Sequence, residues 1–283
     1  MKNILGGALV VLLLLTFLTT HRAIGKTDTA YREQVAVLMY HHIADNNKSS
    51  STITTTLFRE QLKGLHARGY HFIDLGTLKS FLGGGTVPDN AVFVTFDDGY
   101  ESYGQLALPI MKELNIPSIN FLVTSYLDKK KGLGIPVFNR ESLSKIIEET
   151  PLAEFGSHSH NLHDKIDNDA LLIARLNENG HTETEIEYAA RISEDLDTSI
   201  SILKSVRAHG SDAFAYPFGI YDKAAINLVQ ESGFRYGFTI APGMTTHHTH
   251  PMTIPRINIG NPTLTAYEVD FLIRQRIVAV RSQ

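Results

Sequence analysis

The stretch Ala91-Val-Phe-Val-Thr-Phe-Asp-Asp-Gly-Tyr100 decides the fold of this chain. Residues 91–96 are almost all apolar, which predicts a strand buried on both faces, as in a parallel sheet covered by helices. Two carboxylates, Asp97 and Asp98, follow at once. Because polar residues at the carboxyl ends of parallel strands line the active sites of α/β barrels, the stretch also predicts a place for chemistry.

Similar units occur along most of the chain on both sides of this stretch. The hydrophobic spacing predicts further strands at 35–40, 118–123, 153–156, 213–216, 236–240 and 252–257. It predicts helices at 57–68, 106–114, 141–149, 182–205, 223–231 and 266–275. Strands that alternate with helices predict a mostly parallel sheet with helical cover. We therefore expect an α/β fold, a single distorted (β/α) barrel of about seven strands.

Length and charge indicate a single-domain protein that does not bind nucleic acid. A chain of 283 residues fits one α/β barrel, and no internal repeat or second domain is evident. We expect a polar linker at 27–34 and one folded domain at 35–283. The net charge of -4, with no basic stripe, excludes nucleic acid as an expected partner, and the lysines at 129–131 indicate a solvated loop. No obligate protein partner is indicated.

The N-terminus indicates export. After Lys2, residues 4–18 form an almost unbroken apolar run. That run is shorter than the roughly 20 residues of a membrane span and suits a signal peptide. Segment 1–26 is therefore expected to be a signal peptide or an uncleaved signal anchor. Either outcome places the domain outside the cytoplasm, secreted or at the extracellular face of the membrane. The chain has no cysteine, so any metal must be held by histidine and carboxylate.

Polar side chains follow four of the predicted strands where each strand ends. Since these ends share one rim of a parallel barrel, the side chains should lie close together. The groups are His41 and His42, Asp97 and Asp98, the loop from His158 to His163, and Tyr216-Pro-Phe-Gly219.

Two of these groups suit metal chemistry. Adjacent residues of a strand point to opposite sides, so Asp97 and Asp98 can do different jobs, one binding a metal and the other acting beside it as a base. A simple Asp-Gly turn is the alternative. His158 and His163, with one carboxylate, make a two-histidine, one-acid set that leaves coordination positions open.

The remaining histidines are expected to have lesser roles. His160 is expected to support the site or lie at the surface. His247, His248 and His250 lie between a glycine and a proline and are expected to form a solvated loop.

The motifs resemble those of a known family. Thr95-Phe-Asp-Asp-Gly-Tyr100 resembles the first motif of the polysaccharide deacetylases, the NodB-homology family or carbohydrate esterase family 4. His158-Ser159 with His163 resembles the second motif, and Tyr216-Pro-Phe-Gly219 the third. The five-residue histidine spacing and Met39-Tyr-His-His-Ile43 look closest to the branch that acts on poly-β-1,6-N-acetylglucosamine in biofilms.

The resemblance implies a metal-dependent enzyme that removes N-acetyl groups from an N-acetylglucosamine polymer and releases acetate. It implies that Asp98, His158 and His163 hold a divalent ion, zinc first among the candidates. The polymer itself stays open among biofilm polysaccharide, peptidoglycan and chitin-type chains.

The resemblance also implies roles for the catalytic groups. Asp97 would take a proton from the attacking water, and the backbone amide of Phe218 would hold the oxyanion. His41 would protonate the departing amine, with His42 as the weaker candidate. His41 is chosen because the late leucine-histidine motif that usually supplies this acid is absent.

Besides lacking the leucine-histidine motif, the chain differs from the family pattern at a second place. Many members have an arginine just before the proline of the third motif. Tyr216 stands there instead, and Arg256 is the replacement that the sequence offers.

Two other functions also fit parts of the sequence. A glycosidase would use Asp97 with Glu154 or Asp164 and would need no metal, which leaves the histidines unexplained. A catalytically inactive cell-surface carbohydrate-binding module would share the fold, but loss of activity usually removes a ligand or the base, and both are present.

Overall fold

The computed structural model describes residues 29–46, 49–129, 131–132, 134–207 and 210–279. The expected signal segment 1–26 and the first residues of the linker lie outside this range. Within it, no helix is both long enough and apolar enough to cross a membrane.

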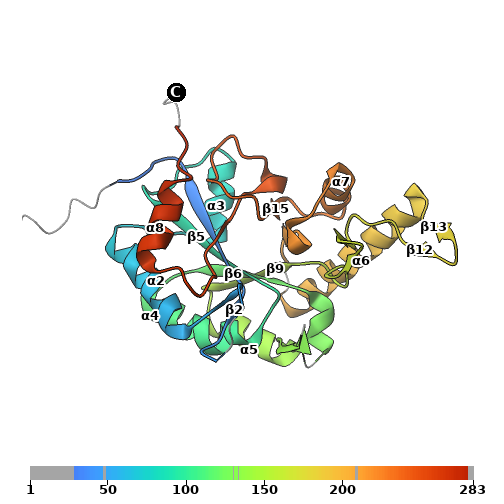
Figure 1. Ribbon diagram of the computed structural model, residues 1–283, viewed down its shortest axis with the longest axis horizontal. Helices are drawn as coiled ribbons and strands as arrows, with labels where there is room; N and C mark the ends of the chain where they lie inside the picture. The colour runs from blue at the N-terminus through green and yellow to red at the C-terminus, as the bar shows by residue number, and fades with distance from the viewer. Residues whose placement is uncertain (1–28, 47–48, 130, 133, 208–209, 280–283) are drawn as a thin grey trace, which may run out of the picture.

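The core of the molecule is a curled, all-parallel sheet (Figure 1). Its path runs β15-β14-β9-β6-β5-β1-β16, and β4 pairs with β5 outside that path. The bounds are β1 Val35–Tyr40, β4 His71–Phe72, β5 Ala91–Asp97, β6 Ser118–Leu122, β9 Ala153–Ser157, β14 Ala213–Ala215, β15 Tyr236–Phe238 and β16 Ile257–Asn258. The expected distorted barrel of about seven strands is confirmed.

Strand β5 is buried on both faces because its side chains point alternately to the helix layer and to the barrel interior. Phe96 points outward and packs edge to face against Phe58 of the covering helix α2 (Thr55–Ala67), with ring centroids 5.9 Å apart. Phe93 points into the barrel, where its ring centroid lies 6.3 Å from that of Phe238. Successive side chains of a strand point to opposite faces, so a strand between a barrel interior and a helix layer must be apolar throughout.

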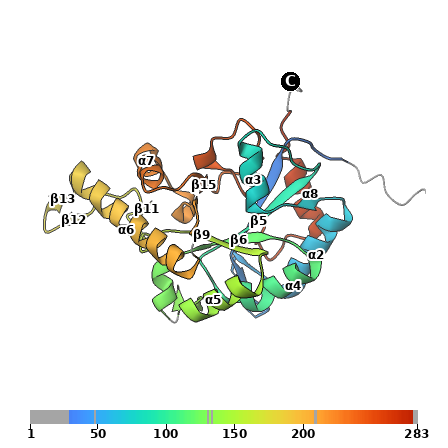
Figure 2. The ribbon, with the colours of Figure 1, turned by 180° about the vertical axis from the view of Figure 1, so that it is seen from behind.

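Helices surround the sheet. The others are α3 Leu75–Leu82, α4 Leu108–Leu114, α5 Arg140–Glu149, α6 Glu185–Val206, α7 Lys223–Glu231 and α8 Ala266–Arg274. Both views show α6 on the opposite side of the molecule from α2 and α8 (Figure 2). A small hairpin, β12 Asn177–Glu178 with β13 His181–Thr182, comes just before this helix in the chain. The helix starts at Glu185, later than predicted, because Thr184 caps it in a reciprocal box with Glu187.

Short elements complete the chain. They are β2 His42–Ile43, β3 Thr52–Ile53, β7 Lys131–Gly132, β8 Ile135–Pro136, β10 Lys165–Ile166, β11 Asp169–Ala170, a π-helical turn at Tyr103–Ala107, and 3₁₀ turns at Thr124–Asp128, Pro217–Gly219 and Pro251–Thr253.

The predicted strand at 252–257 is wrong over its first half. Residues 251–253 form a 3₁₀ turn instead, and the His250 ring accepts a hydrogen bond from the amide of Met252. Beyond the turn, Ile254 bridges to Phe238 and Ile257 pairs with Leu38. Segment 254–258 therefore passes between β15 and β1 and brings the edges of the sheet together.

Candidate metal and catalytic site

All six predicted site residues lie at the carboxyl ends of the strands. Asp97 ends β5, His41 follows β1, His158 follows β9 and Phe218 follows β14. The contacts that join them are His41 to Asp97, both histidines of the loop to Asp98, and the ring of Phe218 to the ring of His163, with centroids 4.6 Å apart. The convergence expected from the strand-end rule is present, and the chemical role of each residue stays a prediction.

A tight turn separates the two aspartates. Asp97 keeps strand geometry, whereas Asp98 and Gly99 take positive φ angles of 76° and 71°. This turn sends the Asp98 carboxylate toward His158 and His163 and leaves that of Asp97 facing His41 and Arg256. Glycine suits the second position because a Cβ there would lie 3.0 Å from Leu122 Cδ2 at an already unfavourable φ.

Asp98, His158 and His163 form a group that could hold a metal ion. One ligand atom from each lies within 4.8 Å of the others, and within the described residues this is the single group of its kind. The Asp98 oxygen Oδ1 lies 3.2 Å from His163 Nε2 and 3.7 Å from His158 Nε2. Burial alone would raise the pKa of Asp98, but the neighbouring imidazoles hold it well below its usual range.

The protonation of His158 is set by its backbone partner. Its Nδ1 lies 2.7 Å from the carbonyl oxygen of Ala215, which can only accept, so Nδ1 carries the hydrogen and Nε2 presents a lone pair toward Asp98. Burial lowers the pKa of His158 to about 4. The ring is therefore neutral near pH 7, which is the form that binds a metal. One carboxylate and two imidazoles that converge in this way fit a divalent ion.

Asp97 is held by Arg256. The two guanidinium nitrogens Nη1 and Nη2 donate to the two carboxylate oxygens over 2.7 and 2.8 Å, and Arg256 is fully buried. Arg256 Nε donates in turn to the carbonyl of Thr239. Burial would raise the pKa of Asp97, but the charge on Arg256 and its hydrogen bonds to the carboxylate lower it. The carboxylate is therefore ionised and fixed in orientation, which suits a general base. Arg256, which the sequence could not place, thus contacts Asp97, the candidate base, because segment 254–258 brings it there.

The two histidines after β1 have different surroundings. His41 Nε2 lies 3.9 Å from Asp97 Oδ2, its side chain is 21% exposed, and its Nδ1 has no hydrogen-bond partner among the described residues. His42 pairs with Ser102 through Nδ1 over 2.8 Å, and its ring packs against Tyr100. Both histidines are partly exposed, and His41 is the one of the two that lies near Asp97.

Phe218 takes an unusual backbone conformation, with φ 58° and ψ 7°. The amides of Gly219 and Ile220 donate to carbonyls of the same turn, whereas no described residue accepts a hydrogen bond from the amide of Phe218. Gly219 permits the turn, because a Cβ there would lie 2.2 Å from Ile240 Cγ1. A free amide beside the ring of His163 could donate to a substrate oxygen.

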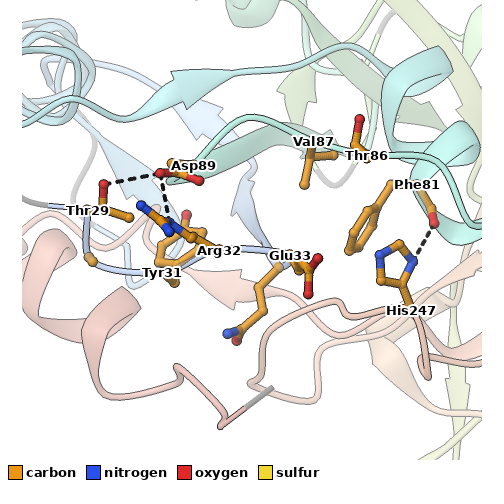
Figure 3. Close-up of a pocket in the computed structure, with 11 residues that line it drawn as sticks. Thr29, Tyr31, Arg32, Glu33, Phe81, Thr86, Val87, Asp89 and His247 are labelled. Carbon is orange, nitrogen blue, oxygen red and sulfur yellow. Dashed lines mark hydrogen bonds and ion pairs between the residues drawn. The ribbon is translucent and has the colours of Figure 1, made fainter. Parts of the chain in front are cut away.

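A cavity of about 700 Å³ lies away from these residues, where β1 and β5 begin. Figure 3 shows its lining, with Thr29 and Arg32 bonded to Asp89 on one side and His247 against Phe81 on the other. His247, His248 and His250 are all exposed, as expected for a solvated loop, and His247 Nδ1 lies 3.0 Å from the carbonyl oxygen of Phe81. Because the chemistry-bearing residues are at the other end of the strands, this cavity is not the candidate site.

Three comparisons with known proteins agree with one another. The family model described as polysaccharide deacetylase matches residues 84–237. Curated relatives named poly-beta-1,6-N-acetyl-D-glucosamine N-deacetylase include one from Staphylococcus aureus strain MSSA476, 24% identical over 223 residues, which cover 79% of this chain and 73% of the relative. Another, from Staphylococcus epidermidis strain ATCC 35984, is 26% identical over 210 residues, 74% of this chain and 68% of the relative.

Solved structures share the fold. A de-N-acetylase from Aggregatibacter actinomycetemcomitans superposes with a TM-score of 0.73 at 21% identity, covering 85% of this chain and all of the other. IcaB from Ammonifex degensii gives a TM-score of 0.70 at 21% identity, covering 85% and 97%. The resemblance that the motifs indicated, to the family and to this branch of it, is confirmed.

Proposed function

The chain belongs to the polysaccharide deacetylase family, and we propose that it is a metal-dependent enzyme that removes N-acetyl groups from an N-acetylglucosamine-containing polysaccharide and releases acetate. The observation that carries the proposal is the buried Asp98-His158-His163 group beside an aspartate that a buried arginine holds in place.

The residues suit amide hydrolysis. A divalent ion held by Asp98, His158 and His163, zinc first among the candidates, would polarise the acetyl carbonyl and lower the pKa of a water molecule. Asp97, ionised and fixed by Arg256, would accept the proton of the attacking water. The free amide of Phe218 would donate a hydrogen bond to the carbonyl oxygen as it gains negative charge.

The leaving group needs its own proton. When the C–N bond breaks, the sugar nitrogen would depart as an amide anion unless an acid supplied a proton. His41, accessible and within reach of Asp97, would donate that proton, so that acetate and a free amine on the sugar are the products.

The substrate is proposed from the relatives. The curated relatives carry poly-β-1,6-N-acetylglucosamine in their names, and we propose the same polymer here, encountered outside the cell. Segment 1–26 would export or anchor the protein, 27–34 would be a linker, and 35–283 would be the catalytic domain. Peptidoglycan and chitin-type polymers carry the same N-acetyl group and are the alternatives to be tested.

Acetate release from a panel of these three polymers tests the proposal. The enzyme is first depleted of metal, with depletion verified by elemental analysis, and then reconstituted with zinc. We expect release from poly-β-1,6-N-acetylglucosamine by the reconstituted protein, and none after depletion. Release from another polymer would correct the substrate, full activity without metal would overturn the metal dependence, and binding of polymer without acetate release would indicate the inactive binding module.

A further inference from the structure

The two candidate metal ligands in the loop after β9 have an awkward spacing. His158 and His163 are five residues apart, and neither helical nor strand periodicity points such a pair at one place. Their Nε2 atoms nevertheless both approach Asp98. The loop between them must therefore be bent and held, and Ser159, with φ 73°, begins the bend.

Side-chain oxygens accept hydrogen bonds from every backbone amide between the two histidines. The amide of Ser159 donates to Ser157 Oγ over 3.1 Å, and that of Leu162 donates to Ser159 Oγ over 3.2 Å. The two amides in the middle, of His160 and Asn161, donate to the two carboxylate oxygens of Asp195 over 2.8 and 2.7 Å. These last two bonds are the shortest of the set and are assisted by the charge of the acceptor.

Asp195 lies on α6, and both of its carboxylate oxygens accept hydrogen bonds from this loop. Its carboxylate is largely buried, and Arg191, one helical turn earlier, donates instead to Glu183 and to the carbonyls of Leu171 and Ala174. One turn later, Ser199 is buried and bonds Ser157, which itself accepts from the loop. The loop is thus fastened to α6 at two adjacent turns of the helix.

We propose that Asp195 is a positioning residue for the metal group, one that bends the His158–His163 loop into its metal-binding shape before any ion arrives. The proposal rests on the proposed function in one respect, namely that these histidines bind a metal. A loop that is already bent loses less conformational freedom when the ion binds, which raises affinity. Partners that orient metal ligands typically account for about 10- to 100-fold in affinity.

The test compares Asp195→Asn with a matched control, Asp270→Asn. Asp270 is a carboxylate of α8 with almost the same exposure, 8% against 9%, and it accepts a hydrogen bond from Tyr70 rather than from the loop. In Asp195→Asn the amide oxygen can still accept from one backbone amide, but its NH₂ group faces the other. Zinc affinity is measured by chelator competition, and the geometry of the ligands by the visible absorption spectrum of the cobalt-substituted protein.

We expect Asp195→Asn to bind zinc about 10- to 100-fold more weakly and to alter the cobalt spectrum. The control should keep the affinity and spectrum of the wild type, even though it loses stability. Wild-type affinity and spectrum in Asp195→Asn would overturn the positioning role while leaving the proposed function intact. A wild-type protein that binds no divalent ion would instead overturn the proposed metal site, and this inference with it.

A second measurement covers the case in which Asp195→Asn does not fold. Hydrogen exchange of metal-free wild type should show the amides of His160 and Asn161 protected, because Asp195 already holds them. Exchange of these amides at the rate of an unstructured peptide would overturn the proposal.

Discussion

At the carboxyl ends of the strands, Asp97 and Arg256 are both buried and share two hydrogen bonds, whereas at the opposite end Arg32 and Asp89 form an exposed ion pair beside the cavity of about 700 Å³. Exposed pairs contribute little to stability, since water and salt screen them. Buried charges persist only where partners compensate for their lost hydration. In this molecule the chemistry is therefore indicated by buried, oriented charge rather than by the volume of a cavity.

The largest effect on stability is expected for Arg256→Met. It leaves the Asp97 carboxylate buried without its main partner, which should lower the free energy of unfolding by about 3–5 kcal/mol. At the opposite end, Arg32→Met should change it by no more than about 1 kcal/mol. Urea denaturation of both variants measures the difference. Equal losses in the free energy of unfolding would contradict the distinction between the buried pair and the exposed pair.

Acid should destabilise the metal-free protein through His158. Its pKa in the folded state is lowered to about 4, against roughly 6.5 in the unfolded chain, so the unfolded chain binds more protons between these values. The stability that comes from keeping this ring neutral is present above about pH 6.5 and is lost as the pH falls toward 4, a change of roughly 3 kcal/mol.

Unfolding curves of metal-free wild type and His158→Gln across this pH range test the effect. The wild type should lose the additional stability, and the variant should not. Parallel pH profiles would contradict the assignment of a buried neutral ring.

His41→Ala should lower turnover by about 10²-fold or more, the usual scale of acid catalysis. Metal content should be unchanged, because His41 is not in the candidate metal group. The loss should shrink on an acetyl ester whose leaving group needs no proton. Turnover within a few-fold of wild type on the amide substrate would move the assignment to His42.

A smaller effect on stability is expected at Asn120, a buried polar residue that lacks the partners that Asp97 and Arg256 have. It is fully buried in β6, and neither its Oδ1 nor its Nδ2 has a hydrogen-bond partner among the described residues. Asn120→Leu, which has the same branching, removes this unpaired amide and should raise the free energy of unfolding by about 1 kcal/mol without changing turnover. A large loss of activity would give Asn120 a role in the site that its location in the sheet does not indicate.

The sequence predicted best what depends on local pattern. Strand β5 and the candidate metal group of Asp98, His158 and His163 follow from a buried apolar run and from the rule that polar residues collect where strands end. Helix α3 was missed, because it is short and only Leu75, Leu78 and Phe81 are buried on it.

What the sequence could not supply are contacts between distant segments. Arg256 reaches Asp97 because segment 254–258 crosses between two strands, and the predicted strand at 252–257 concealed this. Asp195 acts through backbone amides 34 and 35 residues away, and a carboxylate on a long helix carries no motif that would indicate this. The left-handed conformation of Phe218 was likewise not evident, since glycine rather than phenylalanine favours it.

The measurement that tests the central claim most directly is metal content and acetate release in Asp97→Asn and Asp98→Asn, side by side with wild type. If Asp98 binds the metal and Asp97 acts as the general base, Asp97→Asn should keep the metal and lose turnover by roughly 10²- to 10⁴-fold. Asp98→Asn should lose metal affinity as well as activity, because it removes one of the three proposed ligands. A reversed pattern, or acetate release at the wild-type rate by either variant, would contradict the account.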